Sequence, residues 1–204
     1  MRIFGRWLGV IFVSVLIGSA GEYFPTGVLG DSPSQHLFRS DWYSKHLTAM
    51  LEPSLWDASR HDSAAEVYRF LWLRAFHHPI SVRLTVRKDG TGLLTSKETD
   101  GKGGYEPGKL IRNITATLSR EQTDWFRDRA ERSGLWKLPT KQPGAAGLDG
   151  AQWIIEAAKG GRYHIVDRWS PPADDVIAST LCRLNDPLCA IQASRSRLLR
   201  RQFP

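Results

Sequence analysis

The chain has 204 residues, of which 28 are basic and 21 acidic, giving a formal net charge of +7 at pH 7. Two of the basic residues precede residue 21 and four lie in the last ten, and neither end carries an acid, so residues 21–194 are close to neutral. Composition therefore implies no broad basic face and argues against nucleic acid as a partner. The length fits a single domain.

An export signal is predicted over residues 1–20. Arg2 and Arg6 form its charged start, and Leu8–Ala20 is an uncharged, largely apolar run that ends in small residues. Because Glu22 is the only charge between residues 7 and 24, the segment can be a cleaved signal peptide or a retained signal anchor. No later run reaches the roughly 18 apolar residues of a membrane-spanning helix, so membrane contact is expected only through this segment.

The next elements are a flexible lead and a helix. Residues 21–35 are rich in Gly, Pro and Ser and predict the lead. A helix is expected over 36–52, ended by Pro53, and a turn-rich stretch over 53–65 contributes a short anchor. The apolar residues at mostly helical spacing are Leu37, Trp42, Leu47, Met50 and Leu51.

Strands follow. Residues 66–76 are dense in aromatic and aliphatic side chains, and 80–86 alternate in the pattern of a strand with one buried face. Asp89-Gly90 predicts a hairpin into residues 93–98, and 109–118 alternate again after the glycine-rich loop 101–108.

The best-marked helix begins after Ser119, where Gln122 completes a capping box, and ends at Gly134. Asp128 and Arg132 are spaced to form an ion pair on its outer side. Its expected inner face consists of Trp125, Phe126 and Ala130.

A second hairpin is predicted from strands 151–158 and 162–169 around Gly160-Gly161. A helix over 173–184 and a basic tail over 191–204 follow. Strands in hairpins with two or three packed helices indicate an α+β fold with an antiparallel sheet, formed by a single domain over 36–190 and preceded by the N-terminal apolar signal or anchor helix.

The Gly160-Gly161 turn sets the register of this hairpin. It places Trp153 opposite Arg168, Glu156 opposite Ile165 and Ala157 opposite His164. One face then carries Trp153, Ile155, Ala157, His164, Val166 and Arg168, and the other carries Gln152, Ile154, Glu156, Tyr163, Ile165, Asp167 and Trp169. Since His164 is separated from both acids, an acid–base or metal site that needs all three is disfavoured.

Each face of the hairpin still admits a specific hypothesis. Arg168 opposite Trp153 suits a cation–π stack, and this pair with His164 could receive a carboxylate or the acidic side chain of a partner. The alternative is that these groups are ordinary structural residues. The candidate binding residues are Trp153, Glu156, His164, Asp167 and Arg168.

Other motifs give weaker evidence of a functional site. Residues 103–110 approach the phosphate-loop pattern, but Leu110 replaces the hydroxyl residue and Pro107 removes a backbone donor, so a surface loop is expected. His77 and His78 are adjacent and would point in opposite directions on a strand. The common hydrolase and metal signatures are missing, and we assign no catalytic residue, metal ligand or cofactor.

Cys182 and Cys189 are the two cysteines. In an unbroken helix they would be too far apart for a disulfide, but Asn185-Asp186-Pro187 should break the helix and allow Cys189 to fold back. A structural bridge and two separate thiols both remain open.

Four segments of the chain together resemble a family of small exported bacterial proteins without assigned function. They are Glu52–Trp56, Tyr68–His77, Gly147–Trp153 and Tyr163–Pro171. The resemblance covers most of residues 40–172, implies an envelope location and brings no catalytic residues.

The sequence thus predicts an exported, non-catalytic binding or accessory protein, periplasmic or anchored in the inner membrane facing the periplasm. Its partner would be a protein or a small anionic ligand. The first alternative is an envelope hydrolase that uses the hairpin 149–171. The second is a membrane-tethered interaction or immunity-type domain.

Overall fold

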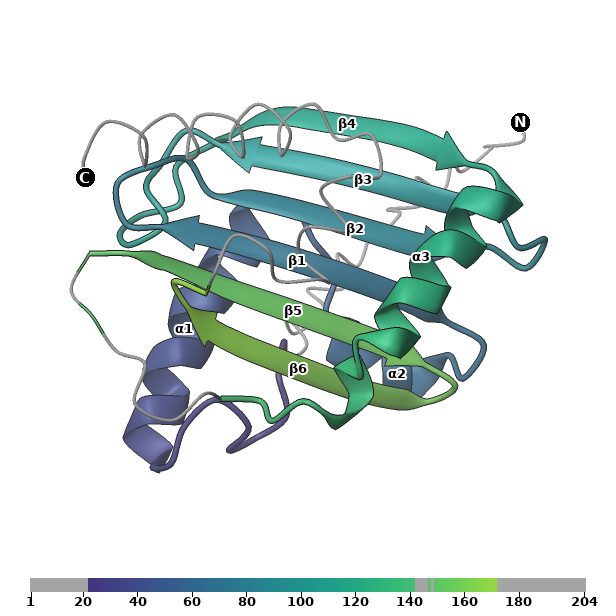
Figure 1. The fold of residues 1–204 in the computed structure, drawn as a ribbon. Helices are drawn as coiled ribbons and strands as arrows, with labels where there is room; N and C mark the ends of the chain where they lie inside the picture. The colour runs from purple at the N-terminus through teal and green to yellow at the C-terminus, as the bar shows by residue number, and fades with distance from the viewer. Residues whose placement is uncertain (1–21, 142–146, 148, 172–204) are drawn as a thin grey trace, which may run out of the picture.

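A computed structural model describes residues 22–141, 147 and 149–171. These residues form a six-stranded antiparallel sheet with helices on both faces, which confirms the α+β prediction (Figure 1). The predicted signal or anchor helix, the helix 173–184, the basic tail and both cysteines lie outside the described residues. Within the described part, no helix is long and apolar enough to cross a membrane.

Each strand in the sheet runs antiparallel to its neighbours, and the order is β4-β3-β2-β1-β5-β6. The first four strands therefore form a meander, and the β5–β6 hairpin adds to its β1 edge. The strands are β1 Glu66–Arg74, β2 Ile80–Val86, β3 Gly92–Thr99, β4 Leu110–Leu118, β5 Ala151–Lys159 and β6 Arg162–Trp169.

Helices α1 (Pro33–Ala49) and α2 (Leu55–His61) cover one face of the sheet, and α3 (Arg120–Arg132) crosses the other, followed by the 3-10 turn η1 (Leu135–Lys137) (Figure 1). We call these the α1 face and the α3 face. The two faces have separate cores. The α1-face core includes Phe24, Leu29, Tyr43, Leu47, Met50, Leu71, Leu73, Ile154 and Ile165. The α3-face core includes Tyr68, Phe70, Val82, Leu84, Phe126, Ala130, Leu135, Ile155 and Val166.

The prediction of a flexible lead is wrong for its described part. Phe24 and Leu29 are fully buried in the α1-face core, and α1 begins at Pro33 with Ser32 as its N-cap. The Gly, Pro and Ser residues of this segment thus form turns and a helix start around two buried anchors. Two of the apolar residues on which the predicted helix rested are exposed: Leu37 of α1 is 66% exposed, and Leu51, which follows the end of α1, is 74% exposed.

Helix α3 forms as predicted. Ser119 accepts a hydrogen bond from Gln122 N and the Gln122 side chain bonds the Ser119 backbone, while Gly134 takes a left-handed conformation after the last turn. The Asp128–Arg132 ion pair is present at 2.9 Å. Trp125 departs from the prediction, since it is 44% exposed and lies beside Arg129.

The predicted register of the β5–β6 hairpin is confirmed at all three pairs: Trp153 with Arg168, Glu156 with Ile165 and Ala157 with His164. Gly160 and Gly161 both have positive φ, as a tight two-residue hairpin turn requires. The polar side of β2 is not solvent-facing as its alternation suggested. Ser81 is 1% exposed, because α1 and the segment after it cover this part of the α1 face.

Candidate functional site

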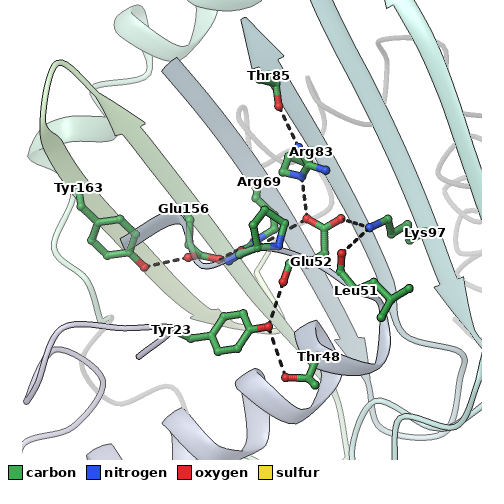
Figure 2. A network of polar contacts seen from close by, with 11 residues as sticks. Tyr23, Thr48, Leu51, Glu52, Arg69, Arg83, Thr85, Lys97, Glu156 and Tyr163 are labelled. Carbon is green, nitrogen blue, oxygen red and sulfur yellow. Dashed lines mark hydrogen bonds and ion pairs between the residues drawn. The ribbon is translucent and has the colours of Figure 1, made fainter. Parts of the chain in front are cut away.

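A cluster of buried charges occupies the centre of the α1 face (Figure 2). Glu52 lies at its middle and forms ion pairs with Arg83 at 2.8 Å, Lys97 at 2.9 Å and Arg69 at 3.6 Å. These three cations come from three successive strands, β2, β3 and β1 respectively. Glu52 itself lies in the connection between α1 and α2, so the cluster fixes that connection to the sheet.

The end of α1 directs Glu52 inward. Glu52 N donates to Leu47 O and Leu51 N donates to Thr48 O, which is the hydrogen-bond pattern of a Schellman motif. Leu51 holds the left-handed position of that motif, with φ of 54°, where glycine is usual. Its carbonyl also accepts from Lys97 Nζ at 2.9 Å. The chain therefore reverses sharply above the cations.

Arg69 extends the cluster to β5. Its Nε and Nη2 donate to Glu156 Oε2 at 2.7 and 2.5 Å, and its Nη1 donates to Pro53 O at 2.6 Å. The Tyr163 hydroxyl donates to the other Glu156 oxygen at 2.9 Å. Both Arg69 and Glu156 have no exposed surface. Both carboxylate oxygens of Glu156 are thus engaged.

At neutral pH the surroundings keep the Glu52 carboxylate charged and the Tyr163 hydroxyl neutral. Burial alone would raise the pKa of Glu52, but Arg69, Arg83 and Lys97 hold that pKa below its ordinary value. Burial and the neighbouring Glu156 charge raise the pKa of Tyr163 well above its ordinary value, so its hydroxyl stays a donor. Three cations and two carboxylates leave one excess positive charge, largely sequestered from solvent.

A second buried carboxylate holds α1 to the β5–β6 hairpin. Asp167 accepts from Arg39 at 2.9 Å, from the Tyr43 hydroxyl at 3.0 Å and from the Gln152 amide. Burial nevertheless raises the pKa of Asp167 above its ordinary value. The Asp167 backbone is also paired, since its N–H donates to Thr140 O at 2.6 Å. This carboxylate therefore orients a helix and is closed to a ligand from solvent.

The five residues predicted to bind a ligand do not converge. Glu156 and Asp167 are buried on the α1 face in the pairs just described, whereas Trp153, His164 and Arg168 lie on the α3 face. Arg168 donates to Pro139 O and Thr140 O, at 2.8 and 2.9 Å. The five residues thus support the scaffold in the described geometry.

The aromatic residues of the α3 face pack with one another. Trp153 contacts Trp72 and Phe70 with ring centroids 5.9 and 5.2 Å away, and His164 lies 6.1 Å from Trp136. Arginine stacking occurs here at Trp72, under Arg74 at 4.5 Å, and at Trp136, under Arg162 at 4.8 Å. In the described residues, no three His, Cys, Asp or Glu side chains gather as a metal site would need.

An exposed aromatic patch was missed by sequence reasoning. It consists of Phe38 and Trp42 from α1, Phe76 from the β1–β2 turn and Tyr105 from the β3–β4 loop. Phe38, Phe76 and Tyr105 are 68, 52 and 56% exposed. Their rings pair at about the same spacing, Phe38 with Trp42 at 6.1 Å and Phe76 with Tyr105 at 6.2 Å. Phe38 does not fall on the helical spacing of apolar residues that predicted this helix. A large aromatic residue off that spacing was the signal in the sequence for an exposed side chain.

The backbone beneath the aromatic patch is firmly held. Trp42 Nε1 donates to Gly103 O at 2.8 Å, Gly103 N donates to His77 O at 3.0 Å, and Gly104 N donates to Ala75 O at 3.2 Å. Gly103 is buried, and a Cβ at its position would come within 2.6 Å of the backbone of β1. The glycine-rich loop therefore packs as a support for the patch. It does not lead into a helix as a phosphate loop would, because β4 follows.

No protein-family model matches the chain, and no curated protein matches it at a significant level.

Proposed function

We propose that the chain is an exported, non-catalytic binding protein that docks a protein partner through the aromatic patch. The observation that carries this proposal is the exposure of three large aromatic side chains on anchored backbone at the junction of α1 with two sheet loops. Exposed groups of large apolar side chains on a monomer surface often mark interaction sites, and aromatic residues are enriched where protein interfaces concentrate their binding energy.

The polar surroundings fit a protein surface. Lys45 of α1 and Glu106 of the β3–β4 loop form an ion pair at 3.0 Å, which joins the two elements beside the patch. Apolar anchors with a charged border are the usual arrangement of a protein interface. The patch is also preorganised, so a partner would not have to order the loop on binding.

The hydrolase alternative has weaker support. Its proposed residues Glu156 and Asp167 are buried and engaged by donors, and His164 lies on the opposite face. A general acid or base must reach the atom whose proton it moves. If catalysis were present, substituting Glu156, His164 or Asp167 singly would reduce the activity of the folded fraction by orders of magnitude.

Photo-crosslinking tests the binding proposal. A benzophenone side chain replaces Tyr105 in the patch, or Trp125 on α3 as a matched exposed aromatic control, and the chain is irradiated in intact cells of its source. We expect a discrete protein adduct from position 105 only, lost when Phe38→Ser and Phe76→Ser are added. Equal adducts from both positions, or an adduct that survives the two serine substitutions, would overturn the assignment of the patch.

Export is tested separately. The intact mass of the chain from the envelope fraction shows whether residues 1–20 have been removed. A mature N-terminus at Gly21 supports release into the periplasm, and an intact N-terminus supports the tethered alternative. Recovery of the chain only from the cytosol would contradict both.

A further inference from the structure

Strand β4 forms one edge of the described sheet. Among the strands that the structure describes, its one neighbour is β3. Of its nine residues only Leu118 is buried, and Ile111 and Ile114 are 51 and 37% exposed. Among residues 22–141, 147 and 149–171, no segment pairs with this side of the strand.

The opposite edge of the sheet, formed by β6, is partly covered by a loop. Lys141 forms a parallel bridge to Asp167 of β6, and Asp167 N donates to Thr140 O. Arg168 adds two hydrogen bonds to the carbonyls of Pro139 and Thr140. A loop therefore covers part of the β6 edge, which is one of the ways in which proteins prevent unwanted strand pairing.

Strand β4 has few of the features that usually prevent an edge strand from pairing with another chain. It contains neither proline nor lysine, its single charge is Arg112, and four of its nine residues are the β-branched types Ile and Thr. Its one irregularity in pairing with β3 falls at Glu98/Thr99, next to the first residue of the strand. A long, weakly charged edge of this composition is a template for pairing with another strand.

The register shows which backbone groups face outward. Arg87 N donates to Thr91 O at the β2–β3 turn, so hydrogen-bonded pairs alternate from that point and Leu94 and Ser96 use their backbone groups toward β4. Their partners on β4 are Ala116 and Ile114. The outward N–H and C=O groups accordingly belong to the alternate residues Ile111, Asn113, Thr115 and Thr117.

We propose that β4 pairs antiparallel with β4 of a second copy, which joins two sheets into one. This inference stands on the edge alone and is independent of the aromatic patch. A twofold axis at Ile114 pairs the whole strand and places Asn113 across from Thr115 in hydrogen-bonded positions, as the outward groups require. Arg112 then lies across from Ala116, so no like charges oppose each other.

A cysteine cross-link tests the register. In the Cys182→Ser, Cys189→Ser background, Ile114→Cys places its two copies directly opposite in a non-hydrogen-bonded pair, where Cα atoms lie about 4.5 Å apart and a disulfide can form. The control Thr117→Cys puts its copies six residues apart along the strand, about 20 Å. We expect a covalent dimer from the first variant only. No dimer, or dimer from the control, would overturn the proposed pairing.

Sedimentation of the purified full chain gives a second measurement. Thr115→Pro removes an outward N–H without removing a bond to β3, and Thr115→Val keeps that N–H. We expect twice the mass of one chain for the unsubstituted protein and for Thr115→Val, and the mass of one chain for Thr115→Pro. A single-chain mass for the unsubstituted protein at every concentration, or a Thr115→Pro variant that stays dimeric, would refute self-pairing.

Discussion

The ion pair between Arg69 and Glu156 is the sharpest place to test the buried charge cluster. Arg69→Met removes the guanidinium and leaves Glu156 buried with the Tyr163 hydroxyl as its remaining donor among the described residues. Glu156→Gln keeps an acceptor for Arg69 but leaves that cation 3.6 Å from its remaining carboxylate, Glu52. Removing one member of a buried pair generally costs about 3–5 kcal/mol of unfolding free energy.

The double variant separates the pair from its surroundings. With both charges removed, Glu52 keeps Arg83 and Lys97, and the excess charge of the cluster stays at one positive unit. The Arg69→Met, Glu156→Gln protein should therefore lose no more stability than the worse single variant. The resulting coupling free energy should be about 3 kcal/mol in favour of the pair.

Urea unfolding followed by circular dichroism measures these free energies from the midpoint and the slope. The exposed Asp128–Arg132 pair on α3 is a matched control, because its side chains are 50 and 79% exposed. Its coupling should stay below about 0.5 kcal/mol. Additive single effects at Arg69 and Glu156, or single losses under about 1 kcal/mol, would refute the buried-pair reasoning.

Three further predictions concern particular backbone and titration positions. Burial and the Lys45 charge lower the pKa of His46 to about 4. Between pH 6.5 and 4, His46 is therefore protonated in the unfolded chain and remains neutral in the folded chain. Stability should fall by up to about 3 kcal/mol across this window as the pH is lowered, and His46→Gln should flatten that dependence in urea titrations. Leu51→Gly relieves a backbone strain of about 1–2 kcal/mol at a left-handed position. Because glycine also has an entropy cost, the unfolding free energy should rise by up to about 1 kcal/mol. A lower unfolding free energy would show that the exposed leucine has a stabilising contact. Gly103→Ala forces a Cβ within 2.6 Å of β1 backbone atoms and should cost about 1–3 kcal/mol, whereas Gly104→Ala, with 3.1 Å of clearance, should cost less; equal melting temperatures would contradict this packing.

Local signals predicted the fold well where they determined the geometry directly. The Gly160-Gly161 turn admits one two-residue hairpin, so its register followed, and the Ser119–Gln122 capping box marked where α3 begins. The start of α1 was missed because Ser32-Pro33 is both a helix start and a linker composition. Which of the two it is depends on whether Phe24 and Leu29 find a core, and local composition does not contain that information.

The charge cluster could not be predicted from the sequence for a different reason. Glu52 and Glu156 lie in separate parts of the chain, and Arg69 lies between them among apolar neighbours. Alternation along a strand shows that two faces differ, but it does not show what covers the polar one. Arg83 was expected to face solvent, and the segment that carries Glu52 covers it instead.

The two buried carboxylate sites have a common consequence for the aromatic patch. Glu52 fixes the end of α1 to three strands, and Asp167 holds the helix at Arg39 and Tyr43, close in sequence to Phe38 and Trp42. Buried ion pairs add little net stability but can select one arrangement over others. Arg69→Met should therefore weaken partner binding through a displaced α1, even though Arg69 contributes no atom to the patch. If binding were unchanged while stability fell, the loops that carry Phe76 and Tyr105 would be sufficient for docking.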